Sequence, residues 1–287
     1  MSEQSLYKIK IEKEELEWLY VPDVEYCEYE GIKRNLQLII PYKRNWSENR
    51  KYPIVFFIPG SAWYRQEMYN NIPRRAELAK RGFVIAEVQY RESELAAFPA
   101  QVIDVKNAIR FIDTLAEQFH IDTDNIFIAG DSSGGHIALL SGLTYAHGEF
   151  DSNYNNNLHQ IKGIISYFAP TDMLLSEGDG PMEDLLGIKQ MSDDLELARS
   201  ASCGTYISMD REIPPILMFH GTNDSMVTVE HSRSFFKKLE QFDKSVSYYE
   251  VEGEEHSSAS FWGEEVLGIV EEFIKGNVDS ETQGSHC

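Results

Sequence analysis

The sequence predicts an α/β fold with a mostly parallel central sheet and helices on both of its faces. Two kinds of segment alternate along the chain from residue 52 onward. The first is a short, continuous apolar run ending in a turn, such as PIVFFIPG at 53–60, which is typical of a strand buried on both faces. The second carries apolar residues three and four positions apart, as in PAQVIDVKNAIRFI at 99–112, and indicates a helix. Such alternation favours parallel strands joined by helical crossovers.

The first 45 residues follow a different pattern, because apolar and polar residues alternate in short runs over 5–45. A period of two is typical of antiparallel strands, so we expect antiparallel N-terminal strands. The other elements are expected in the following order. Strands are predicted at 53–58, 82–90, 125–130, 162–170, 214–221 and 245–253, and helices at 71–81, 99–119, 136–146, 229–242 and 261–274.

The predicted domain organisation is a single domain over 1–278, followed by a flexible polar tail at 279–287. Residues 171–212 lie between two predicted strands and are too long for a plain crossover. We expect short helices at Glu183–Leu186 and Asp193–Arg199 within this segment. Long insertions at sheet ends often line pockets, so we predict a small cap over the site, with a decorated crossover as the alternative.

Composition disfavours several classes of protein. The formal net charge of −21 argues against nucleic acid and anionic membrane surfaces as partners. Three widely spaced cysteines give neither a disulfide framework nor metal-ligand spacing, and we expect no metal site. The N-terminal residues lack the apolar core of a signal peptide, and no run has the length of a membrane span. We therefore expect a cytoplasmic location and no membrane partner, and we make no prediction of oligomeric state.

The stretch FIAGDSSGGH at 127–136 places a serine between a predicted strand and a predicted helix. A nucleophilic serine needs an exposed hydroxyl close to backbone N–H donors, and a sharp strand-to-helix turn supplies both. Such a turn is crowded, so the residues two before and two after the serine should be glycine, as Gly130 and Gly134 are around Ser132. Ser133 is the rival nucleophile, but the glycine spacing fits only Ser132. We expect the N–H of Ser133 to help hold an oxyanion.

The general base and its orienting acid are expected on loops after later strands, the acid first and the histidine second. Asp224 directly follows the predicted strand at 214–221, and His256 directly follows the one at 245–253. The carboxyl ends of parallel strands lie at one edge of a sheet, so these loops are expected to meet the serine there. Asp224 and His256 are therefore the predicted partners of Ser132.

The roles of the acid and of the histidine each have an alternative. Asp172 follows an earlier strand and Glu252 lies near the histidine, so both compete with Asp224 for the acid. The alternative for His256 is an ordinary surface histidine. His220 ends a predicted strand, and we expect it to support the loop that carries Asp224.

The second part of an oxyanion hole is expected from the loop after an early buried strand, which is PGSAW at 59–63. Small residues let backbone N–H groups approach a substrate oxygen, and the expected donors are Ser61 and Ala62. Aromatic residues near this site are candidate substrate contacts that could stack on a sugar or a phenolic acid, with positions in the core as the alternative. These candidates are Trp63, Tyr64 and Trp262.

From about residue 52 to 276 the chain resembles the α/β-hydrolase superfamily and, within it, the hormone-sensitive-lipase-like branch. The motif GDSSGG resembles the GDSAGG of that branch, and FPAQVIDVKNAIRFI and HGTNDSMVTVEHS also match its patterns. PGSAW departs from the usual HGGGW and is similar to the GSAW of small bacterial carbohydrate acetyl or feruloyl esterases. This departure leaves open which of Gly60, Ser61 and Ala62 donates. Ser202-Cys203 stands where the family normally has serine-proline.

The resemblance implies an α/β-hydrolase fold with Ser132, Asp224 and His256 as the triad and no cofactor. The expected function is a serine carboxylic-ester hydrolase for short-chain, chiefly acetyl, esters, with esters of small carbohydrates as candidate substrates. Two alternative enzymes are an arylformamidase-like hydrolase of aromatic N-formyl substrates and an exopeptidase of the prolyl-oligopeptidase type, which the lack of a propeller domain disfavours. A catalytically silent binding protein on the same scaffold is the alternative from a different class.

Overall fold

The computed structural model describes residues 6–10, 16–43, 50–151, 159–175 and 180–279. The strands are β1 Glu17–Tyr29, β2 Ile32–Tyr42, β3 Tyr52–Ile58, β4 Val84–Val88, β5 Ile121–Asp131, β6 Ile161–Tyr167, β7 Ile216–Gly221 and β8 Val246–Val251. The α-helices are α1 Ile72–Lys80, α2 Ala100–Phe111, α3 Ser133–Tyr145, α4 Pro181–Leu186, α5 Leu195–Ser200, α6 Glu230–Gln241 and α7 Glu264–Gly276. Short 3-10 helices span Ile112–Thr114, Met191–Asp193, Cys203–Tyr206 and Ala259–Trp262.

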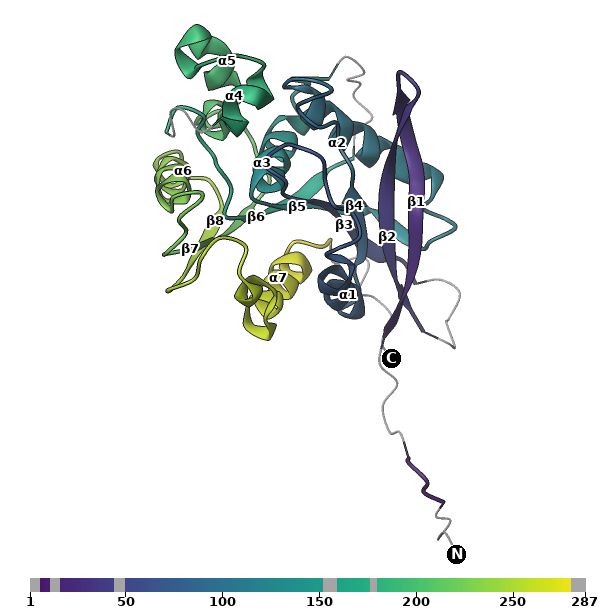
Figure 1. The fold of residues 1–287 in the computed structure, drawn as a ribbon. Coiled ribbons are helices and arrows are strands. Elements are labelled where there is room, and N and C mark those ends of the chain that lie inside the picture. Colours follow the sequence, from purple (N-terminus) through teal and green to yellow (C-terminus); the bar gives the residue numbers. More distant parts are fainter. Residues whose placement is uncertain (1–5, 11–15, 44–49, 152–158, 176–179, 280–287) are drawn as a thin grey trace, which may run out of the picture.

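The strands form one eight-stranded sheet in the order β1-β2-β4-β3-β5-β6-β7-β8. β2 pairs antiparallel with both β1 and β4, and every other neighbouring pair is parallel. Helices α1 and α7 lie on one face of the sheet, and α2, α3 and α6 lie on the other (Figure 1). The predicted architecture of a mostly parallel sheet with helices on both faces and antiparallel N-terminal strands is confirmed.

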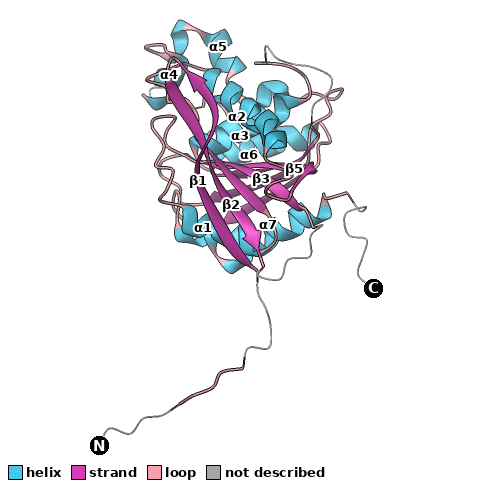
Figure 2. Cartoon of the chain, turned by 90° about the vertical axis from the view of Figure 1, so that its right-hand side faces the viewer, coloured by secondary structure: helices cyan, strands magenta, loops and turns pink. Residues whose placement is uncertain are grey.

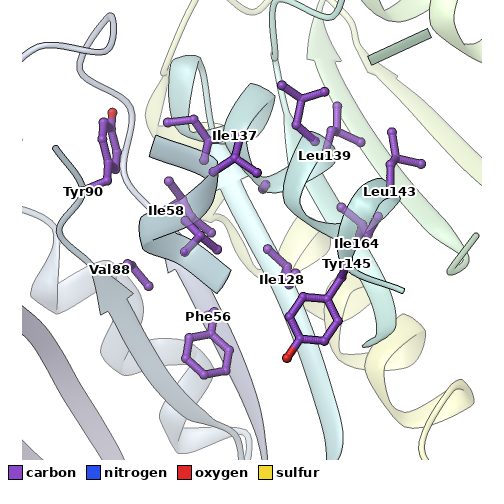
Figure 3. Packing of buried hydrophobic residues seen from close by; sticks show 14 of the residues in the cluster. Phe56, Ile58, Val88, Tyr90, Ile128, Ile137, Leu139, Leu143, Tyr145 and Ile164 are labelled. Carbon is purple, nitrogen blue, oxygen red and sulfur yellow. The ribbon is translucent and has the colours of Figure 1, made fainter. Parts of the chain in front are cut away.

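Each face of the sheet carries its own hydrophobic core. Strand side chains alternate between the two faces, so Ile54, Phe56 and Ile58 of β3 join one core while Val55 and Phe57 join the other. The larger core includes residues of α2 and of α3, among the latter Ile137, Leu139 and Leu143 (Figure 3). The smaller core includes residues of α1 and α7. Burial on both faces explains why β3 is a continuous apolar run in the sequence.

The antiparallel prediction for the N-terminal residues is correct for only part of its range. β1 and β2 are long strands at one edge of the sheet (Figure 2), with register shifts between Val21 and Val24 and between Glu25 and Cys27. Residues 6–10, which also alternate, belong to no strand. Alternation becomes a strand only where a neighbour completes the hydrogen-bond ladder, and here that pairing begins at Glu17.

The helix predicted over 99–119 is shorter in the structure. It ends at Phe111 and continues into a 3-10 turn over Ile112–Thr114. The Thr114 hydroxyl donates a hydrogen bond of 2.8 Å to the carbonyl oxygen of Phe111. A threonine that bonds locally to the backbone competes with helix continuation, which accounts for the early end. The tail predicted at 279–287 lies almost wholly outside the described residues, which end at 279.

Candidate active site

The elbow, defined as residues 130–134, joins β5 to α3. β5 ends at Asp131 and α3 begins at Ser133, so Ser132 alone makes the turn. Its backbone has φ 53° and ψ −127°, an unusual conformation for a residue with a side chain. The N–H of Ser132 donates to the carbonyl oxygen of Tyr167 at 2.9 Å, which fixes the elbow to the end of β6.

The two glycines of the elbow are required by close backbone contacts. A Cβ atom on Gly130 would lie 2.3 Å from the carbonyl oxygen of Gly134. A Cβ atom on Gly134 would lie 2.1 Å from the carbonyl oxygen of Ile58, the last residue of β3. Real Cβ atoms do not approach this closely, so only glycine fits at either position. The spacing that singled out Ser132 in the sequence therefore has a steric cause.

Ser132, His256 and Asp224 form a continuous chain of hydrogen bonds. The Ser132 hydroxyl lies 2.9 Å from Nε2 of His256, and Nδ1 of the same ring lies 2.7 Å from Oδ2 of Asp224. Asp224 follows β7, and His256 follows β8. The three residues meet because their loops leave the carboxyl ends of parallel strands at the same edge of the sheet.

Asp224 is buried and strongly hydrogen-bonded. Burial alone raises the pKa of Asp224, but bonds from His220, from His256 and from the Val227 N–H outweigh it, and the pKa lies well below the usual range. The N–H groups of Met226 and Val227 donate to Oδ1 at 3.0 and 2.8 Å. The side chain of Asp224 is therefore a carboxylate at neutral pH, with one oxygen held by the loop and the other facing His256.

His220 supports this loop, as predicted from its position at the end of a strand. Its Nε2 lies 2.8 Å from the carbonyl oxygen of Val227 and 3.3 Å from Oδ2 of Asp224. Its Nδ1 lies 2.7 Å from the hydroxyl of Ser232 in α6. Since the ring is fully buried, these contacts fix the loop to the end of β7.

The two competing acids lie in other surroundings. Oδ1 of Asp172 accepts the N–H of Leu174 at 2.9 Å and the Ser202 hydroxyl at 3.3 Å, so this carboxylate is bound within the 171–212 segment. Glu252 is exposed to solvent. The nitrogen of His256 that either would need is already bonded to Asp224.

The loop 59–64, after β3, offers fewer free donors than its sequence suggests. The Gly60 N–H donates to Oδ1 of Asp131 at 2.8 Å, and the Ser61 N–H donates to the hydroxyl of Ser133 at 2.9 Å. Within the part of the chain that the structure describes, the N–H groups of Ala62 and Ser133 have no acceptor. This geometry contradicts the expectation that the Ser61 N–H is free to hold an oxyanion, because a serine hydroxyl occupies it.

Two of the three candidate aromatic residues are packing residues. Trp63 is only 3% exposed and packs edge-on against His136 at a centroid distance of 5.4 Å. The ring of Trp262 stacks on Tyr167 at 5.4 Å and lies 4.3 Å from the guanidinium carbon of Arg75. The expectation of substrate contact is thus wrong for Trp63, whose ring is in the core, and the ring of Trp262 packs on the α1 side of the sheet.

Tyr64, the third aromatic candidate, joins the loop 59–64 to the 171–212 segment. Its hydroxyl donates a short hydrogen bond to Oδ2 of Asp184 in α4, and this bond raises the pKa of Tyr64 to about 12. The predicted short helices of the segment are present as α4 and α5, which lie beyond the layer of α2 and α3 (Figure 1). α4 is also held by the bond of 2.8 Å from the Phe98 N–H to the Leu185 carbonyl oxygen.

A buried ion cluster adjoins the elbow. Arg75 of α1 is fully buried, and its Nε donates to Glu87 of β4 at 3.2 Å. A second guanidinium nitrogen lies 4.0 Å from Oδ1 of Asp131, and the guanidinium carbon lies 3.4 Å from the ring centroid of Phe57. Asp131 ends an apolar strand, and a charged residue in that position needs a buried partner, which is a signal for its role that the sequence carries. Asp131 has two partners, because it also accepts the Gly60 N–H.

We expect Glu87→Gln to reduce the pH dependence of stability. Burial raises the pKa of Glu87 to about 7 from its ordinary 4.5, against the opposing effect of Arg75. Between these values the folded protein binds a proton that the unfolded chain has released, so the free energy of unfolding falls as pH rises. The shift amounts to about 3 kcal/mol between pH 4.5 and 7, and the variant should lack it. Urea denaturation of wild type and Glu87→Gln from pH 5 to 8 measures the free energy of unfolding at each pH. The same pH dependence in both proteins would contradict the prediction.

Two kinds of feature are absent from the described residues. No helix among them is both long and apolar enough to cross a membrane. No group of three or more His, Cys, Asp or Glu side chains among them is arranged to hold a metal ion.

Comparison with known proteins identifies the family. The family model described as BD-FAE matches residues 40–239, which is more than half of the chain. The chain belongs to the BD-FAE family. It is also 29% identical over 213 residues to the probable carboxylic ester hydrolase LipM of Mycobacterium tuberculosis, a match covering 71% of this chain and 49% of that protein. This BD-FAE chain spans about half the length of the curated relatives it matches.

Solved structures similar to this BD-FAE protein share its fold. A truncated carbohydrate esterase from gut microbiota gives a TM-score of 0.79 at 22% identity, covering 92% of this chain and 98% of that one. A bifunctional GH43-CE protein of Bacteroides eggerthii gives 0.75 at 27% identity, covering 91% of this chain and 38% of that one. The BD-FAE chain therefore has the α/β-hydrolase fold that the sequence predicted.

Proposed function

We propose that this BD-FAE protein is a carboxylic ester hydrolase that forms an acyl-enzyme on Ser132. The observation that carries the proposal is the hydrogen-bond chain of 2.9 and 2.7 Å from Ser132 through His256 to Asp224. A serine hydroxyl bonded to an imidazole, itself oriented by a carboxylate, is an activated nucleophile. The similarity to a carboxylic ester hydrolase supports the same reaction class.

In the first step the Ser132 Oγ attacks the ester carbonyl carbon while its proton passes to Nε2 of His256. The carbonyl oxygen becomes an oxyanion, and the N–H groups of Ala62 and Ser133 hold it, since neither has an acceptor among the described residues. Asp224 accepts the bond from Nδ1 and stabilises the imidazolium. Its lowered pKa keeps it ionised while His256 is charged.

Collapse of this intermediate breaks the bond to the leaving oxygen. The alcohol departs with the proton from Nε2, and Ser132 carries the acyl group. In the second half a water molecule gives a proton to Nε2 and attacks the acyl carbonyl. The acid is released as Ser132 regains its proton from His256, and every proton is thereby returned.

We infer that the substrates are short-chain, chiefly acetyl, esters of small carbohydrates. Two of the similar structures are described as a carbohydrate esterase and as a bifunctional GH43-CE protein, which supports the sugar part. Tyr64, which is partly exposed in the loop 59–64, is the candidate to contact the sugar ring. The 171–212 segment, which Tyr64 joins through Asp184, is proposed as a cap beside the site.

The test is acetate release from acetylated xylo-oligosaccharides, measured beside hydrolysis of p-nitrophenyl acetate. We expect both substrates to be cleaved, and the wild-type protein to be labelled by a fluorophosphonate. Cleavage of p-nitrophenyl acetate alone would support the esterase activity and reject carbohydrate esters as the substrates. Preferential hydrolysis of N-formylkynurenine would favour the arylformamidase alternative. Failure of every reaction, including the label, would reject the enzyme in favour of a binding protein.

A further inference from the structure

His136 is a buried histidine outside the hydrogen-bond chain, and both of its ring nitrogens are bonded. His136 lies in α3, one turn after Ser132, and is 1% exposed. The indole N–H of Trp63 donates to its Nδ1 at 3.1 Å, and its Nε2 lies 2.7 Å from the carbonyl oxygen of Ala201. Because Nδ1 accepts and a carbonyl can only accept, the proton is on Nε2 and the ring is neutral. Burial lowers the pKa of His136 to about 4, in agreement with this state.

These two bonds join three separate parts of the site. Trp63 directly follows Ala62 in the loop 59–64. His136 belongs to the nucleophile helix, and its own N–H donates to the carbonyl oxygen of Ser132 at 3.1 Å. Ala201 directly follows α5 in the 171–212 segment. All three contacting residues are buried, at 3% exposure or less.

The backbone of the loop needs such an anchor. Ala62 and Trp63 have φ values of 53° and 61°, so two consecutive residues with side chains are in the left-handed region. Each such residue costs of the order of 1 kcal/mol or more and persists only where its surroundings hold it. The Trp63 carbonyl oxygen accepts the Ser93 N–H at 2.9 Å, and the Trp63 side chain is held by His136. The bond to His136 joins this loop to the interior of the helix that follows Ser132, and the bond from the Ser61 N–H to the Ser133 hydroxyl joins the loop to the first residue of the same helix.

We propose that His136 is a positioning residue. It holds the Ala62 N–H next to Ser132 through Trp63, and it fixes the 171–212 segment to α3 through Ala201. The proposal rests on the esterase function proposed above. His136 does not contact the reacting atoms and acts through Trp63. An oxyanion donor must lie close to where the charge develops, and a displacement of about 1 Å can cost about 100-fold in rate. Loss of either bond therefore lowers turnover while leaving ground-state binding nearly intact.

The experiment compares variants that remove or replace these bonds. His136→Leu removes both bonds, Trp63→Phe removes only the indole donor, and His136→Gln retains one acceptor and one donor. Tyr206→Phe is the matched control, since it removes a bond of 2.6 Å to the Ser200 carbonyl oxygen, next to Ala201, without touching the loop. For each variant kcat and KM are measured per active site titrated with a fluorophosphonate, so that unfolded protein is not counted.

We expect kcat per titrated site to fall about 10- to 100-fold in His136→Leu and in Trp63→Phe, with KM within about twofold. His136→Gln should remain within about threefold of wild type, and Tyr206→Phe should match it. An unchanged kcat per titrated site in both Trp63→Phe and His136→Leu would overturn the proposal. A loss in His136→Gln as large as in His136→Leu would also overturn it. If His136→Leu fails to fold, Trp63→Phe still tests the proposal.

Amide hydrogen exchange provides a readout that needs no activity. If His136 positions the loop, exchange at residues 60–66 should accelerate in Trp63→Phe and remain near wild type in Tyr206→Phe. Exchange at 60–66 that is unchanged in Trp63→Phe would overturn the positioning role. A wild-type protein that neither hydrolyses esters nor reacts with the fluorophosphonate would instead reject the esterase function, and the exchange result would still decide whether His136 holds the loop.

Discussion

Replacing Ser132 with alanine is expected to lower kcat/KM for p-nitrophenyl acetate by about 10⁴-fold or more. The variant retains the oxyanion donors and the imidazole but has no oxygen to form the acyl-enzyme, so only water attack remains. We expect the fold to persist, because among the described residues the Ser132 side chain is hydrogen-bonded only to Nε2 of His256. Far-ultraviolet circular dichroism and the melting temperature check the fold, and initial rates measure the loss.

Ser133→Ala is the matched control for this prediction. It removes the hydroxyl of the neighbouring serine, which accepts the Ser61 N–H, but leaves the Ser133 N–H in place. The decrease in kcat/KM in Ser133→Ala should be far smaller than the decrease in Ser132→Ala. A fluorophosphonate should add its mass to wild type and to Ser133→Ala, and not to Ser132→Ala. A rate near wild type in Ser132→Ala, or an equal loss in Ser133→Ala, would contradict the assignment of the nucleophile.

Much of the fold and of the triad geometry was predictable because the determinants are local. Buried parallel strands require apolar residues on both faces, and this requirement is visible in runs such as PIVFFI. The elbow requires Gly130 and Gly134, so the identity of the serine follows from two residues four positions apart. Once the strands are placed, topology alone brings the loops after β7 and β8 to the elbow.

The remaining errors concern side chains whose partners are distant in the sequence. The Ser61 N–H donates to the hydroxyl of Ser133, 72 residues later in the chain, and no local sequence pattern predicts that bond. The indole N–H of the buried Trp63 finds its acceptor in His136, 73 residues away. Long-range pairing of this kind depends on three-dimensional packing, which spacing along the chain does not contain.

The second large effect is expected from Gly134→Ala. The added Cβ would lie 2.1 Å from the carbonyl oxygen of Ile58 and 2.7 Å from its carbonyl carbon. These are backbone atoms of a central strand, so the clash can be relieved only by moving α3 away from β3. We expect the free energy of unfolding to fall by about 3 kcal/mol, at the upper end for overpacking in a core. Turnover should fall as well, because that movement separates Ser132 and the Ser133 N–H from Ala62.

Gly268→Ala in α7 isolates this clash from the general effect of adding a methyl group to a helix. A Cβ atom at Gly268 meets no described residue within 4 Å, so the substitution should stabilise the protein by about 0.5–1 kcal/mol through helix propensity alone. Both changes are glycine to alanine within a helix, and neither glycine has a positive φ. The difference between the two variants in urea denaturation therefore measures the contact with β3. Equal stabilities, or full activity in Gly134→Ala, would show that the elbow tolerates a side chain there and that the glycine spacing has another cause.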